Sequence, residues 1–311
     1  MIAEYDVIIA TYNGEKYIVD QLDSILNQSV KPKNIILRDD CSFDNTLQIL
    51  QKYSKVYPNI KLIKDDFGNL GYVKNFEKLC QAVESEIVFF SDQDDVWLDN
   101  KAEMVLNVFE DSNHSAVFTN AYLVDSKLKN KGLLLPQNFD IIKSNVDILY
   151  RNFVTGCTLA VKRNALMSLL PFPDVIPHDY WIAANCALTK SIKYINTPLI
   201  KYRQHECNLI GIKDTNIFTK INKLTYTSVL KRREFLIEKH TLVNHLISRG
   251  TVSSNRLHST LNILNSALSH RFGFKYLKSF KKSMGFKDFI LHLYDKLIIK
   301  VTNIRNPVEY D

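Results

Sequence analysis

The sequence predicts an α/β fold built on a mainly parallel sheet with helices on both faces. Short apolar runs alternate with segments whose apolar residues recur at helical spacing. This strand and helix unit repeats through the first hundred residues, as parallel strands joined by crossover helices require. With 311 residues, 46% of them apolar, the chain can bury one large core or a core plus a smaller one.

The elements of the first half follow one another at the spacing of crossover connections. Apolar strands are expected at residues 5–10, 34–37, 60–63 and 86–90. Helices are expected between them at residues 17–26, 44–53 and 72–83. Because parallel sheets bind ligands where their strands end, the polar residues that follow these strands are the first candidates for function.

The pattern changes twice in the second half. Strand-like runs are expected at residues 116–124, 157–162 and 191–202, with a helix at 179–188. After Gly211 the sequence reads as helices rich in Lys and Arg, with examples at residues 229–247 and 286–301. We therefore expect an α/β domain at residues 1–212 and a basic helical region at residues 213–311.

The positive charge of the chain lies in its C-terminal third. The formal net charge is +7, yet residues 213–311 hold 18 Lys and Arg against 7 Asp and Glu, which leaves a net of −4 for residues 1–212. Such basic helices suit a surface of anionic lipid. The alternative is a solvated region that packs on the α/β domain or on a second subunit.

Cysteine spacing and hydropathy indicate a cytosolic protein. The five cysteines are odd in number and widely spaced, which predicts reduced thiols rather than a disulfide framework or a zinc cage. No run reaches the roughly 18 apolar residues of a membrane helix. The N-terminus lacks the basic start and cleavage site of a signal peptide.

The strongest functional signal is SDQDDVW, directly after the strand at residues 86–90. Its three carboxylates, Asp92, Asp94 and Asp95, repel one another unless a cation lies among them, and oxygen ligands of this kind suit Mg²⁺ or Mn²⁺. A divalent cation there could bridge a diphosphate. The alternative is an acidic turn that caps a helix beginning near Leu98. The position at a strand end, with Trp97 following, favours the metal site.

A second acidic pair, Asp39 and Asp40, follows the strand at residues 34–37. Asp39 can accept a hydrogen bond from a base imide or a ribose hydroxyl, and its alternative is a solvated turn. Asp44 is expected to be the N-cap of the next helix.

Two loops add amide groups near the same edge of the sheet. Asn13 and Gly14 form a common hairpin signal, but a helix follows them instead of a strand, so this turn is free to face a ligand. The segment GNLG precedes the third helix and has Asn75 just inside that helix. Loop punctuation is the alternative interpretation of the second segment.

Two late segments supply three further candidate residues, Asp179, Arg203 and His205. Asp179 opens a helix in PHDYW, where it could be the N-cap, the general base for a sugar hydroxyl, or both. In YRQH, Arg203 could clamp phosphate and His205 could ligate the metal. A lone histidine is more often an ordinary surface or core residue.

Taken in order, these motifs resemble the family 2 glycosyltransferases, over about residues 4–212. The resemblance implies a GT-A fold, in which a nucleotide-binding α/β half merges with an acceptor-binding half. ATYNGEKY is similar to the opening strand and nucleotide loop of that family, and YRQHECN to a segment of its rhamnosyltransferase-like bacterial members. The family resemblance therefore predicts binding of a nucleoside diphosphate sugar.

The same resemblance assigns roles to individual residues. It implies that the base and ribose lie near Thr11, Tyr12, Asn13, Asp39 and Asp92. It implies that Asp94 holds the metal, with His205 as a further candidate ligand, and that Asp179 is the general base. The residues expected beside the donor diphosphate or the acceptor are Asn75, Asp95, Trp97, His178 and Arg203.

Two positions depart from the family pattern. Cys41 stands where the family commonly has Gly after its Asp pair, and His178 stands before Asp179 where the family has Glu. Neither change removes a carboxylate that the chemistry needs. The second change bears on how the acceptor is recognised.

The resemblance implies inverting transfer by one in-line displacement at the anomeric carbon. Asp179 takes the proton of the acceptor hydroxyl, and a divalent metal, Mn²⁺ or Mg²⁺, offsets charge on the departing nucleoside diphosphate. We expect a dTDP- or UDP-sugar donor, rhamnose among the candidate sugars, and a saccharide acceptor, lipid-linked, in the assembly of O-antigen or capsule. The enzyme would then lie in the cytoplasm, peripheral on the inner face of the plasma membrane, with oligomer contact through the C-terminal helices as the other use of that region.

Three other functions compete with this interpretation. A nucleic-acid-binding protein would explain the basic helices but not the acidic clusters, so we expect no nucleic-acid partner. A sugar nucleotidyltransferase should show a glycine-rich loop with Arg or Lys after the first strand, and ATYNGEKY has one glycine. A carbohydrate-binding module without catalysis would not need the metal.

Overall fold

The computed structural model describes residues 3–110, 112–139, 148, 152–205, 226–250 and 258, with the backbone alone for residues 226–236. The chain divides into two compact units: Met1–Ile148 with Asn152–Gly211, and Leu149–Arg151 with Ile212–Asp311. This division lies beside the boundary expected at residue 212. The roles of the two regions stay predictions.

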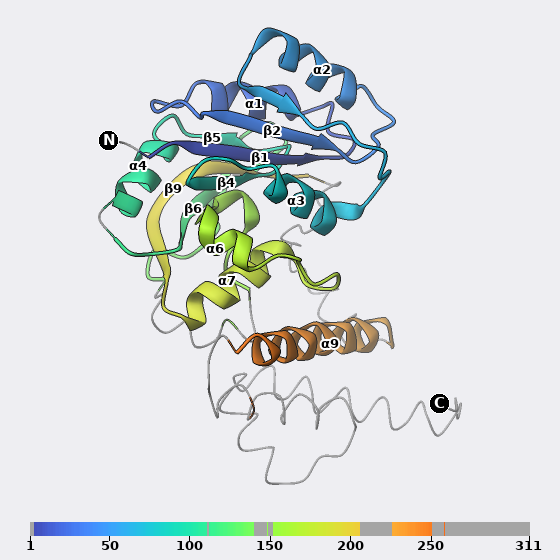
Figure 1. Cartoon of the computed structure of the whole chain (residues 1–311), viewed down its shortest axis with the longest axis vertical. Helices are drawn as coiled ribbons and strands as arrows, with labels where there is room; N and C mark the ends of the chain where they lie inside the picture. Colours follow the sequence, from blue (N-terminus) through green and yellow to red (C-terminus); the bar gives the residue numbers. More distant parts are fainter. Residues whose placement is uncertain are drawn as a thin grey trace. The chain divides into compact units, whose positions relative to one another are not determined.

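The first unit contains one sheet whose N-terminal half is parallel (Figure 1). Its strands, in their order across the sheet, are β3 (Ile60–Leu62), β2 (Asn34–Asp39), β1 (Tyr5–Thr11) and β4 (Ile87–Ser91). All three neighbouring pairs in this half are parallel. The residues of β1 and β4 are almost all buried, because helices cover both faces, and this explains their unbroken apolar runs.

Three helices connect these strands on opposite sides of the sheet. They are α1 (Ile18–Leu26), α2 (Thr46–Val56) and α3 (Gly71–Gln81). Figure 1 shows α1 and α2 on one side and α3 on the other. The chain starts at β1 and builds outward to β3, then returns to the other side of β1 to form β4. The carboxyl ends of β1 and β4 therefore lie at a reversal of strand order, where open α/β sheets bind ligands.

The second half of the sheet is mixed. Its strands are β5 (Val96–Trp97), β6 (Ala116–Asp125), β7 (Asn130–Leu133), β8 (Leu159–Lys162) and β9 (Ile192–Gln204). The pair β6 and β9 is parallel, whereas β8 pairs antiparallel with both β4 and β6, β7 with β6, and β5 with β9. The mainly parallel arrangement expected from the sequence thus holds for the half made of β3, β2, β1 and β4, while the periodicity of a single sequence does not encode strand direction in the other half.

The remaining described helices of this unit are α4 (Lys101–Glu110), η1 (Gly156–Thr158), α6 (Arg163–Ser168) and α7 (His178–Leu188). The helix expected near Leu98 begins at Lys101, because Val96 and Trp97 pair with β9 instead. The strand expected from residue 157 begins at Leu159, after the short helix η1. Both shifts arise from contacts with segments distant in sequence.

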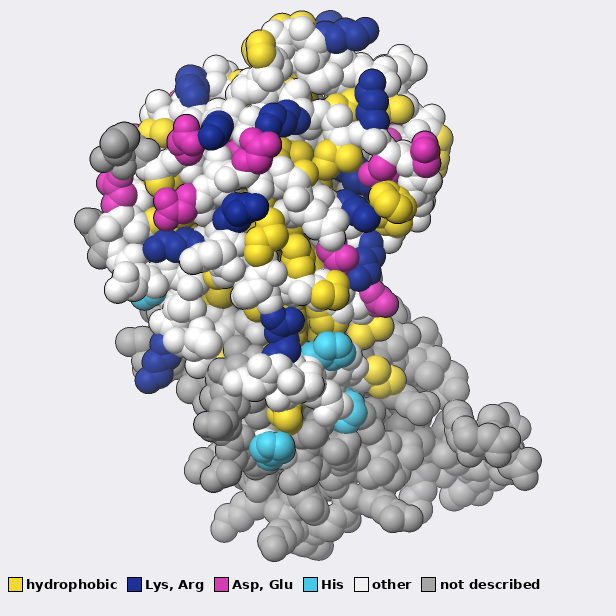
Figure 2. All heavy atoms as spheres, in the orientation of Figure 1, with side chains coloured by type: hydrophobic (Ala, Val, Ile, Leu, Met, Phe, Trp, Pro, Cys, Tyr) yellow, Lys and Arg dark blue, Asp and Glu magenta, His cyan; other side chains and the backbone are white. Residues whose placement is uncertain are grey.

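Charged residues of both signs are interspersed on the face of the first unit drawn in Figure 2. This mixture agrees with the small net charge of residues 1–212. In the second unit the structure describes α9 (Tyr226–Ser248), which covers the helix expected at residues 229–247. The helix expected at residues 286–301 lies outside the described residues. Among the described helices, none combines the length and hydropathy needed to cross a bilayer.

Candidate active site

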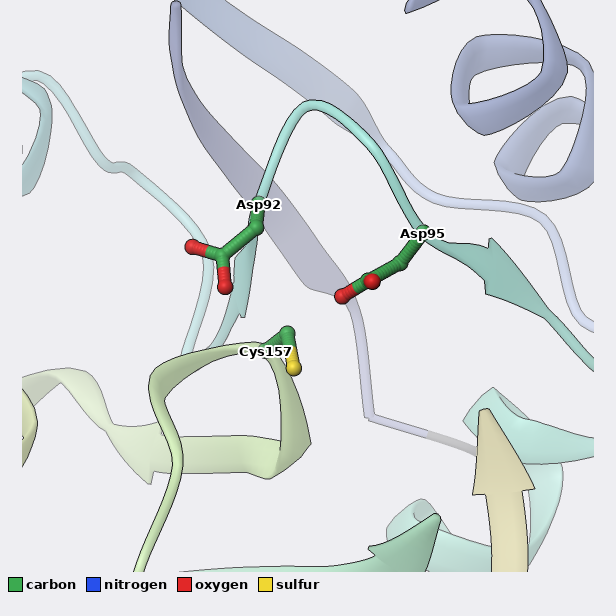
Figure 3. Close-up of side chains that lie close together, drawn as sticks. All are labelled: Asp92, Asp95 and Cys157. Atoms are coloured by element: carbon green, nitrogen blue, oxygen red, sulfur yellow. The ribbon is translucent and has the colours of Figure 1, made fainter. Parts of the chain in front are cut away.

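The loop between β4 and β5 places the acidic motif at the reversal of strand order. Figure 3 shows Asp92 and Asp95 on this loop and Cys157, from η1, facing them. Ligand atoms of these three residues lie within 4.8 Å of one another. Cys157 and Asp95 are fully buried. The structure therefore joins the acidic loop to a segment some sixty residues later in the chain.

This environment raises the pKa values of both Asp92 and Asp95. Burial, followed by the charges of Asp94 and Asp179, raises the pKa of Asp92. Burial, followed by the charges of Asp94 and Asp92, raises the pKa of Asp95, while the Arg203 amide acts in the opposite direction. Carboxylates this close cannot all ionise at low cost unless positive charge is near.

Lys101 brings positive charge to the same cluster from inside the protein. Its side chain is fully buried, and Nζ donates a hydrogen bond of 2.8 Å to the Cys157 carbonyl. Nζ also lies 3.5 Å from the centre of the Trp97 ring. Burial lowers the pKa of Lys101 to about 7, against the raising effects of Cys157, Asp95 and Asp92.

Sequence reasoning missed both Lys101 and Cys157. One signal for Lys101 was available, because it stands four residues before Val105 on the apolar face of α4, where a lysine is unusual. Nothing in the sequence pairs Cys157 with the acidic loop. The expectation that Trp97 lies beside the donor or the acceptor also needs correction. Trp97 is 1% exposed and its ring centre lies 5.6 Å from that of Phe89, so it offers no surface to either substrate.

Asp94 and His205 lie together, as their shared role requires. His205 Nε2 and Asp94 Oδ2 are 2.8 Å apart, and their side chains are 13% and 14% exposed. A carboxylate oxygen and an imidazole nitrogen are both ligands that Mn²⁺ accepts, and this pair reaches solvent. The donor set therefore fits a divalent cation in place of the direct contact between the two side chains.

Arg203 hydrogen-bonds the acidic loop between β4 and β5, and its side chain is buried. Its backbone amide donates to Asp95 Oδ1 at 2.9 Å, and its Nε donates to the Asp94 carbonyl at 2.7 Å. Its Nη1 donates to the Ser126 carbonyl and its Nη2 to Asp20 Oδ2, each at 2.9 Å. Because the side chain is 3% exposed and these donors bind protein acceptors, the expectation that Arg203 clamps phosphate is corrected.

The nucleotide loops of β1 and β2 are brought together at the same edge. Thr11 pairs with Asp39 in the sheet, and its hydroxyl donates to Asp39 Oδ1 at 2.9 Å. Ser42 donates its amide to Asp39 Oδ2 at 2.8 Å and its hydroxyl to Oδ1 at 2.6 Å. Cys41 adopts φ +65, the left-handed conformation that favours glycine, which is the residue that the family resemblance leads one to expect here.

The turn at Asn13 and Gly14 is fastened to its surroundings. The Asn13 amide donates to Ser42 Oγ at 2.8 Å, and Asn13 Oδ1 accepts from the Phe43 amide at 3.0 Å. A Cβ on Gly14 would lie 2.3 Å from Gln93 Oε1, so a larger residue there would displace the end of the Gln93 side chain. Gln93 exchanges two hydrogen bonds with the Tyr12 backbone, at 2.9 and 3.0 Å. Tyr12 is left 44% exposed at this edge.

The second member of the acidic pair, Asp40, organises the start of α3. Asp40 Oδ1 accepts from Arg38 Nη1 and from the Leu70 amide, and its Oδ2 accepts from the Gly71 amide, each at 2.8 Å. Asn75 is 2% exposed, and its side chain hydrogen-bonds Arg38. Asn75 therefore does not present its amide to a diphosphate, which corrects that expectation.

Asp44 is structural, as expected, but the prediction that it is the N-cap of α2 is wrong. Its Oδ1 accepts from the Thr46 amide at 2.9 Å, at the first turn of α2, although Asn45 occupies the N-cap position itself. Its Oδ2 accepts from the Glu15 amide at 3.1 Å. Asp44 thus links the first two loops of the site.

Asp179 lies in the first turn of α7, one residue inside the helix. Pro177 is the N-cap, which excludes the N-cap alternative for Asp179 and leaves the general-base hypothesis. Asp179 Oδ2 accepts from the Gly156 amide at 3.1 Å and its Oδ1 from the Tyr180 amide at 2.6 Å. Its charge contributes to the raised pKa of Asp92, so the two carboxylates share one electrostatic environment.

His178 points into the protein and not into the acceptor side. Its ring is 4% exposed and lies 4.1 Å from the Phe76 ring and 5.3 Å from the Phe90 ring. Burial lowers its pKa to about 3, so the imidazole is neutral near pH 7. The expectation that His178 contacts donor or acceptor is therefore corrected; it packs the start of α7 against β4 and α3.

Known proteins resemble this chain along most of the α/β unit. The sequence profile described as "Glycosyl transferase family 2" matches residues 6–170. The chain is 33% identical to a dTDP-rhamnosyl transferase, RfbG, of Shigella flexneri over 65% of this chain and 73% of that protein. It is 25% identical to a UDP-Glc:alpha-D-GlcNAc-diphosphoundecaprenol beta-1,3-glucosyltransferase, WfgD, of Escherichia coli over 67% and 79% of the two chains.

A solved structure shares the fold. A crystal structure of S. aureus TarS residues 1–349 in complex with UDP-GlcNAc superposes with a TM-score of 0.56 at 20% identity, covering 93% of this chain and 81% of that one. This likeness confirms the GT-A fold expected from the sequence.

Proposed function

The chain belongs to glycosyl transferase family 2, and we propose that it moves a sugar from a dTDP- or UDP-sugar to a saccharide acceptor in the assembly of a bacterial O-antigen or capsule. RfbG, by its name a dTDP-rhamnosyl transferase, makes dTDP-rhamnose the first donor to test. WfgD, by its name, uses UDP-Glc and an acceptor on diphosphoundecaprenol, which supports a lipid-linked acceptor here. Family membership sets aside the nucleotidyltransferase and nucleic-acid-binding alternatives.

One observation carries the proposal: carboxylates from separate segments gather at the reversal of strand order. Asp39 ends β2, Asp92 and Asp94 follow β4, and Asp179 begins α7. A sugar nucleotide needs contacts to base and ribose, charge compensation at its diphosphate and a base beside the anomeric carbon. These segments offer the corresponding groups in that order.

The proposed reaction is a single displacement with inversion. The acceptor hydroxyl oxygen forms a bond to the anomeric carbon while the bond from that carbon to the diphosphate oxygen breaks. The proton of the hydroxyl passes to Asp179, and the bonding electron pair leaves with the nucleoside diphosphate. The amides of Gly156 and Tyr180 hold the Asp179 carboxylate in place, and a positioned carboxylate can act as the general base.

Asp94 and His205 would hold a divalent cation, Mn²⁺ or Mg²⁺. When bound, this cation supplies compensation for the charge of the diphosphate leaving group. Arg203 fixes the Asp94 backbone and Asp95 fixes the end of β9, so the protein itself positions the two ligands. Hydrogen bonds from the Thr11 and Ser42 hydroxyls hold the Asp39 carboxylate, which would bind the nucleobase of the donor.

Location and partners are proposed on charge alone. The basic residues 213–311 would hold the enzyme on the anionic inner face of the plasma membrane, where each Lys or Arg near the headgroups contributes about 1 kcal/mol. Vesicles with anionic lipid should then retain the full chain and release a chain ending at Gly211. Equal retention of both would leave oligomer contact as the use of this region.

Thermal stabilisation by nucleotides tests the function. The purified protein is heated with dTDP, UDP and their sugars, with and without Mn²⁺ or Mg²⁺. We expect one nucleotide to stabilise the protein only with metal, and Asp94→Asn to abolish this effect. Asp179→Asn should retain nucleotide binding and lose about 10²- to 10⁴-fold in turnover, the usual contribution of a general base. Full turnover by Asp179→Asn would remove Asp179 as the base.

A further inference from the structure

Two exposed aromatic side chains directly follow residues that hydrogen-bond Asp39, namely Thr11 and Ser42. Tyr12 follows β1 and is 44% exposed, and Phe43, in the loop after β2, is 83% exposed. Their ring centres are 5.9 Å apart and the rings are nearly perpendicular, at 89°. The two rings form a corner open to solvent.

Hydrogen bonds of the backbone hold this corner in place. The Phe43 amide donates to Asn13 Oδ1 at 3.0 Å, and the Asn13 amide donates to Ser42 Oγ at 2.8 Å. The Tyr12 backbone is fixed by both polar atoms of the Gln93 amide. A phenyl ring on a mobile tip could fold onto the protein surface, whereas this one is kept in solvent by its anchored backbone.

Asp39, which hydrogen-bonds the residue before each of these aromatics, has unused acceptor capacity. A carboxylate oxygen can accept two hydrogen bonds. Among the described residues, Asp39 Oδ1 accepts two, from Thr11 and Ser42, and Oδ2 accepts one, from the Ser42 amide. The two loops therefore offer two exposed ring surfaces, and the carboxylate that joins these loops has an oxygen able to accept from a ligand N–H.

We infer that Phe43 is a base-contacting residue, which together with Tyr12 encloses the planar base of the nucleoside diphosphate. The inference rests on the proposed function and adds a contact to it. A base lying in the corner stacks on one ring and meets the other with its edge, while an imide N–H reaches Asp39. A planar ring with a donor at its edge matches this combination better than a sugar or a phosphate does.

Affinity for nucleotides with and without a base tests the role of Phe43. Titration calorimetry compares UDP and dTDP with inorganic pyrophosphate, all with Mn²⁺, on the full chain. We expect Phe43→Ala to weaken both nucleotides about 10-fold, in the range that loss of one stacking ring produces, and to leave pyrophosphate unchanged. Val56→Ala is the matched control, since Val56 is 60% exposed at the far end of α2 and should leave every affinity unchanged.

A second variant keeps the ring and supplies a signal. Phe43→Trp should bind UDP and dTDP within about threefold of the unmodified protein, and stacking should quench its emission. The native Trp97 and Trp181 are each 1% exposed, so a bound nucleotide should not contact them. The emission of the unmodified protein on nucleotide binding therefore serves as the background for the Phe43→Trp signal.

The outcomes separate the inference from the proposed function. If Phe43→Ala binds nucleotides as tightly as the unmodified protein, Phe43 does not contact the base. The same conclusion follows if the variant loses as much affinity for pyrophosphate as for the nucleotides. In both cases the inference is wrong while the proposed function stands. If the unmodified protein binds no nucleoside diphosphate with any metal, the proposed function fails and the inference fails with it.

Discussion

Replacement of Arg203 by Met tests whether this residue supports the acidic loop or binds phosphate. The variant removes three side-chain hydrogen bonds, two of them to the Asp94 and Ser126 carbonyls and one to Asp20. The Asp20 side chain is 54% exposed and can bind water instead, so its loss costs little. The two carbonyls lose partners in partly buried positions, at about 1–3 kcal/mol each.

The expected loss is therefore about 4 kcal/mol, the middle of the range for two carbonyls, or a fall of roughly 8–16 °C in the unfolding temperature of a domain of this size. Differential scanning calorimetry measures it, with urea unfolding as a second measurement. Arg163→Met is the matched control, because Arg163 is exposed and its Nε makes one bond, to the Val83 carbonyl. We expect that control to lose about 1–3 kcal/mol, the cost of one carbonyl that loses its partner, where Arg203→Met leaves two.

A phosphate clamp would give the opposite result for Arg203. Arg203→Met would then keep its unfolding temperature and lose affinity for the donor and for pyrophosphate. That outcome would refute the structural role assigned from burial and hydrogen bonding.

Two further predictions concern Lys101 and Cys41. Because the pKa of Lys101 is about 7 in the folded protein and near 10.5 when unfolded, the unfolded chain binds more protons between these values, and stability conferred by this site rises as pH increases from 7 to 10. The free energy of unfolding of the unmodified protein minus that of Lys101→Met should therefore increase over this interval, and a constant difference in urea unfolding would contradict the shifted pKa. Cys41→Gly should raise the free energy of unfolding by about 0.5–1 kcal/mol, since glycine adopts φ +65 without steric cost but loses more entropy on folding. Calorimetry of Cys41→Gly beside Cys41→Ala checks this, and equal stability of the two variants would contradict it.

Local sequence was sufficient for the elements whose cause is local. The strands β1 and β4 could be predicted because both of their faces are buried, which requires unbroken apolar runs. The carboxylates that follow β2 and β4 could be predicted as a site because parallel strands end at one edge. The structural role of Asp44 was predicted for a similar reason, since its partner Thr46 is two residues away.

Tertiary contacts decided which polar residues reach solvent. Arg203, His178 and Asn75 carry the same chemistry as real ligand-binding residues, and only the packing of β9, α7 and α3 shows that they are buried. Strand direction in the second half was undecided for the same reason, because each strand of β5, β7 and β8 pairs with a partner chosen by the whole fold.

By itself, the sequence determined the α/β class, the parallel half of the sheet and the order of the acidic motifs, since these follow from periodicity and from residues adjacent in the chain. Only the tertiary structure brought Cys157 and Lys101 to Asp92 and Asp95 and turned Phe43 toward solvent. Burial and charge interactions depend on distance in space, and segments separated by sixty residues become neighbours only when the sheet forms.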